Sequence, residues 1–413
     1  MGSNGRAPRK RQESIIQLKD RETMDIGYKY APFSLATYVD PNQKNKELDV
    51  AMLNKVQKDG YKLVYEVNHK NKQGYGELKN ENFPTKPSKG LNYKIFSNGE
   101  EVVVAFRGTE MNTFADLATD SKLFWGALGK KTPVADQAYQ AIEVMEKIKE
   151  LQEKGLLPKK VTVTGHSLGG HISNFVGRAY PDMVDKVVGF NSAFNKDFAM
   201  PLHDYLFNAD SEVKRRAFQN VVSNTREDNV YNFVGKSSLN IISAEEKQYN
   251  LIKLSGDSHK MGEFWQSIAL QNLLVQSGFS LKESTDYLVR QFEKNRWNST
   301  GDIAAKDLQF ILSKTDTKLE NSTVQEFLKG YDNVLEKAKS GQIAIQGIID
   351  PKTKNAFTGF VLPKSSREEG NITQVKELEQ GKRVCGKTTT NYGDGSRIVT
   401  PQICDDNDGG LRP

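Results

Sequence analysis

The sequence contains no long hydrophobic run. Nowhere in its 413 residues do about eighteen apolar residues follow one another, and the mean hydropathy is −0.61, so we expect no membrane-spanning helix and only peripheral contact with lipid. The first eleven residues are basic, but neither an apolar segment nor a small-residue cleavage site follows them. A Sec signal peptide is therefore not predicted, and we expect a chain that is secreted without such a signal, or cytoplasmic before export.

Cysteine and histidine are scarce, with two of the former and five of the latter. No spacing of these residues matches a metal site. Cys385 and Cys404 are 19 positions apart in a polar region, where a disulfide and two unpaired thiols are both open interpretations. The net charge of +6 is spread along the chain, which argues against a nucleic-acid partner and slightly favours an anionic membrane surface.

The pattern of apolar residues divides the chain into four parts. Residues 1–25 are polar and charged, which predicts a flexible basic arm. In residues 26–278 short apolar runs alternate with amphipathic segments, which predicts an α/β sheet covered by helices on both faces. Residues 279–370 favour amphipathic helices, one of them opening with a Ser322/Gln325 capping pair, and residues 371–413 favour a loop-rich tail.

Within the α/β part, individual elements follow from the spacing of apolar residues and from glycine and proline stops. The pattern predicts helices at residues 134–155 and 168–181, and strands at residues 62–67, 91–96, 101–106, 160–164, 186–190, 218–223 and 249–254.

One turn of this pattern carries a chemical signal. The run Gly165-His166-Ser167-Leu168-Gly169 matches G-x-S-x-G and lies between an expected strand and an expected helix. A turn this tight gives the serine a strained backbone and exposes its hydroxyl at the carboxyl edge of the sheet. The N–H of Leu168, at the positive end of the helix, is then a candidate donor to an oxyanion. An ordinary glycine-flanked turn is the alternative.

A serine hydroxyl needs a base to take its proton, and the five histidines limit the choice. His166 lies inside the motif, His171 on the following helix and His69 before the nucleophile, whereas this arrangement orders its residues serine, acid, histidine. Of the remaining two, His259 stands in a loop after an apolar run and before a helix, while His203 leaves too little chain for an intervening acid. We predict His259 as the base, with a surface loop histidine as the alternative.

The carboxylate that orients this base is predicted at Asp228, which closes the expected strand at residues 218–223. Its neighbour Glu227, and Asp210 or Asp197 earlier in the chain, are the rivals. A solvated loop carboxylate is the alternative interpretation of Asp228.

A second segment bears on the oxyanion hole. An expected strand ends in Phe106-Arg-Gly-Thr109, which puts a hydroxyl and an N–H near the carboxyl edge of the sheet. Thr109 is therefore a candidate for the second oxyanion donor, unless it only ends the strand. Arg107 and the Asp116/Asp120 pair are expected to form structural ion pairs.

These residues together resemble the class 3 lipases, in which F-R-G-S/T at a strand end, D-x-x-x-D, G-H-S-L-G-G and a downstream Asp and His recur in this order. The matching segments are Phe106–Thr109, Asp116–Asp120, Gly165–Gly170, Asp228 and His259, and the likeness covers about residues 25–278. The resemblance implies an α/β-hydrolase lipase domain at residues 26–278. Within it, Ser167, Asp228 and His259 are implied to be catalytic, and Thr109 and Leu168 to form the oxyanion hole. The 31 positions between acid and histidine are few for this family, which implies trimmed substrate loops.

Within that family the chain is similar to bacterial phospholipase A1 enzymes, some of which are secreted without a Sec signal. The segment Gly27–Tyr38 adds to this likeness. The resemblance implies hydrolysis of the sn-1 acyl ester of glycerophospholipids. A carboxylesterase, thioesterase or triacylglycerol lipase of the same fold is the alternative, and an inactive scaffold that binds a partner is the alternative from a different class.

Residues 121–131 bear on the substrate, because they join bulky apolar side chains to lysines between glycines. A lid or interfacial loop has this composition, and so does a loop packed on the core. A lid predicts a water-insoluble ester with an anionic headgroup, hence a phospholipid membrane surface as partner. An accessory or immunity protein at the C-terminal region stays open. The triad requires no cofactor or metal, and the sequence leaves a calcium requirement open.

Overall fold

In the computed structural model the chain forms two compact units, and both boundaries between them fall within helices. Unit 1 comprises Met1–Asp25 and Trp265–Pro413, and unit 2 comprises Ile26–Phe264. The structure describes residues 7–40, 44–68, 73–84, 91–108, 133–192, 211–223, 229–235, 251–254, 260–282, 284–286, 288, 304–305, 307–309, 311–312, 323–340, 343–349, 356–363, 384–391 and 397–403. Some of these, including all residues from 343 onward, are described by their backbone alone.

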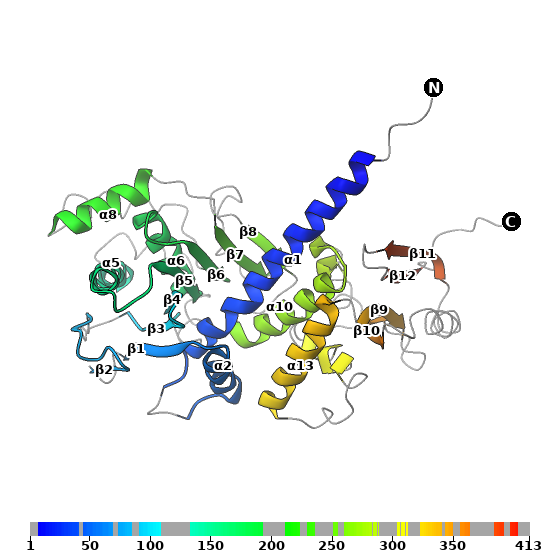
Figure 1. Ribbon diagram of the computed structural model, residues 1–413, viewed down its shortest axis with the longest axis horizontal. Coiled ribbons are helices and arrows are strands. Elements are labelled where there is room, and N and C mark those ends of the chain that lie inside the picture. Colours follow the sequence, from blue (N-terminus) through cyan, green and yellow to red (C-terminus); the bar gives the residue numbers. More distant parts are fainter. Residues whose placement is uncertain are drawn as a thin grey trace. The chain divides into compact units, whose positions relative to one another are not determined.

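Unit 2 is built on a mixed sheet of eight strands (Figure 1). The strands lie in the order β2-β1-β3-β4-β5-β6-β7-β8. Their bounds are β1 Lys62–Asn68, β2 Gln73–Tyr75, β3 Tyr93–Ser97, β4 Glu101–Phe106, β5 Lys160–His166, β6 Lys186–Phe190, β7 Val230–Gly235 and β8 Leu251–Leu254. The first four are antiparallel neighbours, and β4 to β8 run parallel, so the carboxyl ends of five strands meet at one edge.

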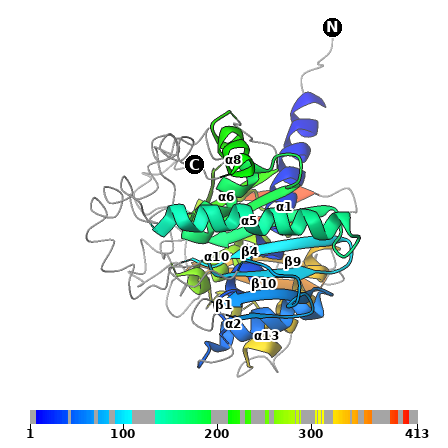
Figure 2. The same ribbon diagram turned by 90° about the vertical axis from the view of Figure 1, so that its left-hand side faces the viewer.

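Helices cover both faces of this sheet because the strand side chains are apolar on both sides. On one face, Val102 and Val104 of β4 pack in a core with α5 (Pro133–Glu153), α6 (Leu168–Ala179) and α8 (Glu212–Ser223). Figure 2 shows α5 on this side of the sheet, running roughly alongside β4. On the other face, the second half of α1 (Ala7–Ala36) packs through Phe33, whose ring lies edge-on to Tyr61 at 4.9 Å and to Phe96 at 5.3 Å. Unit 2 is thus an α/β fold with flanking helices.

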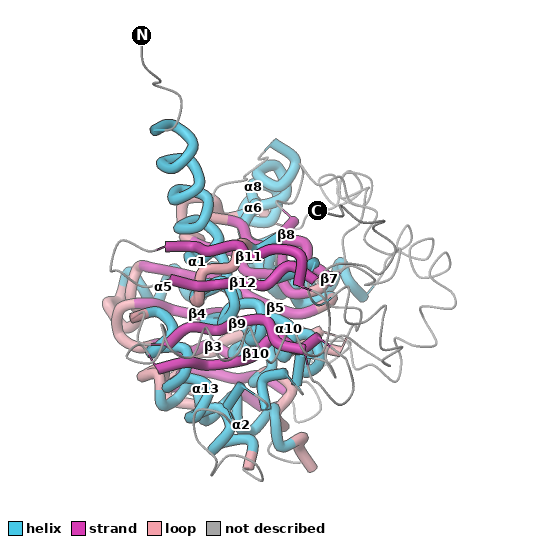
Figure 3. The backbone as a smooth tube through the Cα atoms, turned by 90° about the vertical axis from the view of Figure 1, so that its right-hand side faces the viewer, coloured by secondary structure: helices cyan, strands magenta, loops and turns pink. Residues whose placement is uncertain are grey.

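Unit 1 joins the first part of α1 to the chain's last 149 residues. Here Gln276 of α10 (Met261–Gln276) donates to the carbonyl of Arg21, and Lys339 of α13 (Val324–Lys339) pairs with Asp25 at 2.9 Å. Four strands follow α13 and form two hairpins: β9 Ile343–Ile349 with β10 Ala356–Pro363, and β11 Val384–Asn391 with β12 Arg397–Ile403 (Figure 3).

The structure corrects the sequence at both ends of the chain. Residues predicted to be a flexible arm form helix from Ala7 onward. The region to residue 370, predicted mostly helical, and the tail beyond it, predicted loop-rich, contain the four strands β9 to β12. The cap of α13 is Thr323 with Glu326, one residue after the predicted pair. Alternation of apolar residues in these strands is weak, which is why their period was not visible.

Within unit 2 the expected strands at 101–106 and 186–190 coincide with β4 and β6, and β4 pairs with the antiparallel strand β3 before it. The prediction of a strand at residues 218–223 is wrong, because these residues form the second half of α8. Its buried residues Ala217, Phe218 and Val221 recur at helical intervals, a period that only a window opening near residue 212 reveals. β7, which begins at Val230, was not predicted.

A buried carboxylate fastens α1 to the amino edge of the sheet. Glu101, 2% exposed at the start of β4, accepts hydrogen bonds from Tyr30 (2.6 Å), Tyr61 (2.7 Å) and Thr162 (2.6 Å). Lys29 lies 3.1 Å from the same carboxylate. Burial alone would raise the pKa of Glu101, but these hydrogen bonds outweigh it and lower the pKa to about 2. The ionised form is therefore the one that the fold stabilises.

We expect Glu101→Gln to lower the free energy of unfolding by about 2–3 kcal/mol at pH 7. Because the folded pKa lies below the ordinary value of 4.5, this stabilisation is complete above that value and is lost as pH falls toward about 2. Urea unfolding at pH 7, 4 and 2.5 measures it. The exposed neighbour Glu100→Gln is the control, expected to change stability by less than about 0.5 kcal/mol. A Glu101→Gln deficit that stays constant with pH contradicts the assignment.

Candidate functional site

Ser167 occupies a strained turn between β5 and α6. Its backbone dihedrals are φ 57° and ψ −120°, a combination outside the left-handed helical region that non-glycine residues occasionally visit. Such a conformation costs on the order of 1–3 kcal/mol and persists only where the surroundings impose it. The serine stands at the N-cap of α6, yet its hydroxyl does not cap the helix, whereas an N-cap serine usually does so.

Backbone hydrogen bonds on both sides impose this conformation. The N–H of Ser167 donates to the carbonyl of Phe190 in β6 at 3.0 Å, and its carbonyl accepts from the N–H of His171 in α6 at 3.1 Å. The turn is thus tied to the neighbouring strand and to the first turn of its own helix. Leu168 begins α6, so its N–H is one of the four that a helix leaves without a partner inside it, at the positive end of the helix dipole.

Two glycines of the motif are required by close packing of backbone on backbone. A Cβ at Gly169 would collide with the carbonyl of Phe106 in β4. A Cβ at Gly165 would collide with the backbone of Gly169 and would lie 2.8 Å from the same Phe106 oxygen. Helix α6 therefore approaches β4 more closely than any side chain at these positions permits.

Ser167 itself is 1% exposed, whereas the sequence predicted an exposed hydroxyl. The end of β4 contributes to this burial: a Cβ at Gly108 would lie 3.2 Å from the Cβ of Ser167 and 2.9 Å from the Tyr38 hydroxyl. The serine lies below the surface, between the end of β4 and helix α6.

The histidines inside and after the motif have structural surroundings. His166 is 3% exposed, and its Nδ1 is hydrogen-bonded to the Tyr38 hydroxyl at 2.9 Å. His171 lies on α6 with its side chain nearly buried. The other three, His69, His203 and the predicted base His259, lie outside the described residues. His259 follows β8, which ends at Leu254 on the same sheet edge as Ser167.

The local structure around Asp228 differs from the one on which its prediction as the acid depends. The strand that Asp228 was predicted to close is helix α8, and β7 begins after it. At the start of β7, Asn229 accepts from the N–H of Val187, which is in register with Val163 of β5. Ser167 stands four residues beyond Val163, about 13 Å further along the strand direction. β7 thus starts at the edge opposite Ser167 and ends, at Gly235, on the serine's edge.

Several other candidates fall outside the described residues: Asp228 itself, its rivals Glu227, Asp210 and Asp197, the oxyanion candidate Thr109, the pair Asp116 and Asp120, the segment 121–131, and Cys404. Cys385 lies in β11, where the backbone alone is described.

Arg107, expected in an ion pair, is half-buried with its guanidinium 5.2 Å from the centre of the Tyr38 ring. The carboxyl of Asp49 in α2 (Glu47–Lys58) is also close enough to feel its charge. Burial raises the pKa of Asp49 to about 6, and the positive charges of Lys46 and Arg107 oppose this shift.

A polar network that the sequence did not reveal joins α6 to β7. Asn174 of α6 and Asn232 of β7 exchange two hydrogen bonds, at 2.8 and 2.9 Å, and both side chains are buried. Ser192, at the end of β6, also donates to Asn232. The signal was an asparagine inside the apolar run Val230–Gly235, which is unfavourable in a buried strand unless its amide is paired.

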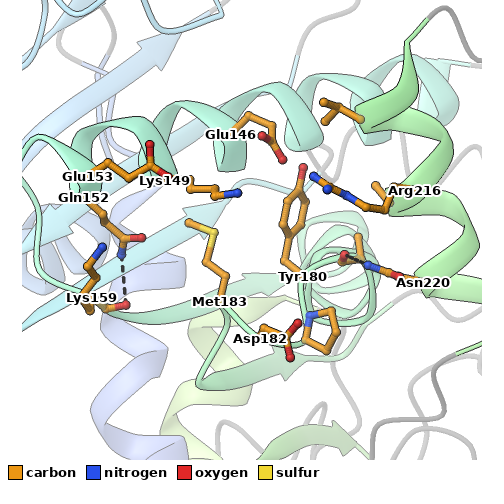
Figure 4. Close-up of a pocket in the computed structure, with 14 residues that line it drawn as sticks. Glu146, Lys149, Gln152, Glu153, Lys159, Tyr180, Asp182, Met183, Arg216 and Asn220 are labelled. Carbon is orange, nitrogen blue, oxygen red and sulfur yellow. Dashed lines mark hydrogen bonds between the residues drawn. The ribbon is translucent and has the colours of Figure 1, made fainter.

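A surface depression of about 560 Å³ lies at the other end of α6 (Figure 4). Tyr180 stands in it, with Glu146 and Arg216 on either side of its hydroxyl. Because α6 has 12 residues, this depression lies about 18 Å from Ser167 along the helix axis. It is therefore separate from the strained turn.

Comparison of the chain with protein-family models, with curated proteins and with solved structures finds no match in any of the three. Among the described residues, no helix combines the length and the apolar character needed to cross a membrane.

We expect Gly169→Ala to destabilise the protein by about 3 kcal/mol or more, because its Cβ meets backbone atoms that cannot rotate away. Gly99→Ala is the matched control: Gly99 has φ 87° and open space around it, so its replacement costs about 1 kcal/mol for the left-handed conformation alone. Urea unfolding of the two variants measures the difference. Equal losses would show that α6 can move away from β4 freely.

Proposed function

We propose that this chain is a serine hydrolase of carboxylic esters with Ser167 as its nucleophile. The observation that carries the proposal is the backbone of Ser167, strained at φ 57° and ψ −120° between a parallel strand and a helix. A protein gains no stability from such a conformation. It does gain a nucleophile held ahead of a helix N-terminus, which is the geometry that acyl transfer requires.

The proposed reaction has two steps. The Ser167 oxygen attacks the ester carbonyl while a histidine takes its proton, and the N–H of Leu168 donates to the oxygen that becomes negative. The alcohol leaves with the proton returned by the histidine, and water then hydrolyses the acyl-enzyme by the same route. We propose His259 as this base, because it follows β8, whose carboxyl end lies on Ser167's edge of the sheet. Thr109, which follows the end of β4, is the proposed second oxyanion donor.

The acid must come from a segment that follows a strand on that same edge. The candidates between β6 and α8 are Asp197, Asp204 and Asp210, and those between β7 and β8 are Glu245 and Glu246. Asp228 precedes β7, whose start lies at the opposite edge. We therefore propose the acid among these five rather than at Asp228.

For the substrate we propose a glycerophospholipid cleaved at its sn-1 ester, which makes the protein a phospholipase A1 acting at a membrane surface. The resemblance of the motifs to class 3 lipases supports this choice, as does the apolar and basic composition of residues 121–131. Secretion without a Sec signal, and a partner protein at the C-terminal region, belong to the same proposal.

The first test is release of fatty acid from phosphatidylcholine labelled differently at sn-1 and sn-2, with a short p-nitrophenyl ester assayed in parallel. We expect release of the sn-1 label, reduced about 10⁴-fold or more in Ser167→Ala. Turnover of the short ester with intact liposomes would instead indicate a carboxylesterase. No Ser167-dependent activity on either substrate would indicate a scaffold without catalysis.

A second test separates the acids. We expect Asp228→Asn to keep activity within about threefold. One of Asp197→Asn, Asp204→Asn, Asp210→Asn, Glu245→Gln and Glu246→Gln should lower kcat by about 10³–10⁴-fold, as loss of an orienting carboxylate does. The measurement is the initial rate on the short ester, normalised to folded protein by circular dichroism. A large loss of kcat in Asp228→Asn alone would instead identify Asp228 as the acid, as the sequence predicts.

A further inference from the structure

Three segments that are far apart in the sequence meet beside the strained turn. The turn after α1 supplies Tyr38, the end of β4 supplies Arg107 and Gly108, and the end of β5 supplies His166 and Ser167. All of them belong to unit 2. Their meeting point is Gly108, because a Cβ there would touch the Tyr38 hydroxyl on one side and the Cβ of Ser167 on the other.

The Tyr38 hydroxyl is held in place by contacts on its ring and its backbone. The guanidinium of Arg107 lies over the ring at 5.2 Å, and the ring meets the His166 imidazole at an interplanar angle of 62°. The N–H of Tyr38 donates to the carbonyl of Leu35, which fixes the turn that ends α1. The end of α1 is in turn fastened to β5 by the hydrogen bond between Ser34 and Thr164 at 3.2 Å.

In this arrangement the hydrogen bond between Tyr38 and His166 anchors the residue that precedes Ser167. His166 is the residue joined to the strained Ser167, and its side chain is anchored to Tyr38 through Nδ1 at 2.9 Å. A strained backbone relaxes unless its neighbours are fixed on both sides. On the helix side the Ser167 carbonyl is fixed by the bond from His171. On the strand side the bond from the Ser167 N–H to the Phe190 carbonyl fixes the backbone, and the anchor of the His166 side chain at Tyr38 adds to it.

We propose that Tyr38 is a positioning residue for the nucleophile: its hydroxyl, through His166, holds Ser167 at the end of β5 in the orientation required for attack. This inference rests on the proposed function. Tyr38 acts through another residue and does not itself touch the substrate. The chemistry of the ester is not involved, so the effect extends to any substrate that Ser167 attacks.

The test replaces Tyr38 by phenylalanine, which keeps the ring against Arg107 and removes only the hydroxyl. We expect kcat on the short ester and the rate of covalent labelling by a fluorophosphonate to fall about 10- to 100-fold, with KM changed by less than about twofold, since a small misplacement of a reacting group costs this much. Active-site titration counts the competent molecules, so that a loss of folded protein is not read as a loss of kcat.

Tyr61→Phe is the matched control, because Tyr61 is also a tyrosine whose hydroxyl makes a hydrogen bond to a buried side chain, here Glu101 at the opposite edge of the sheet. We expect this variant to unfold at a lower temperature and to keep its kcat. Tyr38→Phe is expected to show the reverse pattern. A hydroxyl with a purely structural role would lower the unfolding temperature in both variants and kcat in neither.

A double-mutant comparison isolates the route through His166. In a His166→Phe background, Tyr38→Phe should lower kcat no further, because the bond that it removes is already absent. Tyr38→Phe that keeps kcat within about twofold of wild type, or that lowers kcat equally with and without His166, overturns the proposal. Failure of the wild-type protein to react with the fluorophosphonate overturns the proposed function instead, so the two failures are distinguishable.

Discussion

The close approach of α6 to β4 is the constraint on which the rest of unit 2 depends. The helix touches the Phe106 carbonyl through Gly169, and Gly165 leaves no room for a side chain between the two. With the helix this close, the residue that connects β5 to α6 cannot adopt a relaxed turn, and Ser167 takes dihedrals that a non-glycine residue ordinarily avoids. The same approach brings the end of β4 against the serine, so that β4, β5 and α6 define the site together.

The two edges of the sheet hold α1 by different chemistry. At the amino edge, the ionised Glu101 gathers hydrogen bonds from α1, β5 and the residue before β1, an arrangement whose effect is on stability and which weakens in acid. At the carboxyl edge, the hydrogen bonds of Ser34 with Thr164 and of Tyr38 with His166 hold the end of α1 to β5. A charged group at this edge is Arg107, whose guanidinium lies over the Tyr38 ring.

Strain at Ser167 is offset by packing that surrounds it on every described side. The Phe190 carbonyl comes from β6, the His171 N–H comes from α6, and Gly108 follows the end of β4. We expect a conformation held by three elements to survive the loss of any one of these contacts with the fold intact. Its geometry does not survive equally well, and a reacting group is sensitive to shifts that stability barely registers.

The sequence by itself determined several local elements of unit 2, and the strand–turn–helix at Ser167 among them. Runs such as 101–106 and 186–190 are apolar enough to be strands in any context, and G-H-S-L-G between a strand and a helix admits few conformations. It did not determine α8, because the helical spacing of its apolar residues is visible only in a longer stretch of sequence. It did not determine the strands after residue 340 either, because apolar and polar residues alternate only weakly in them. Only the tertiary structure decided at which edge of the sheet each strand begins and ends. Asp228 precedes the start of β7, which lies at the edge opposite Ser167. It also brought Tyr38, 129 positions from Ser167, to the strained turn. Local propensity acts over a few residues, whereas strand order, register and long-range hydrogen bonds arise only when the whole sheet closes.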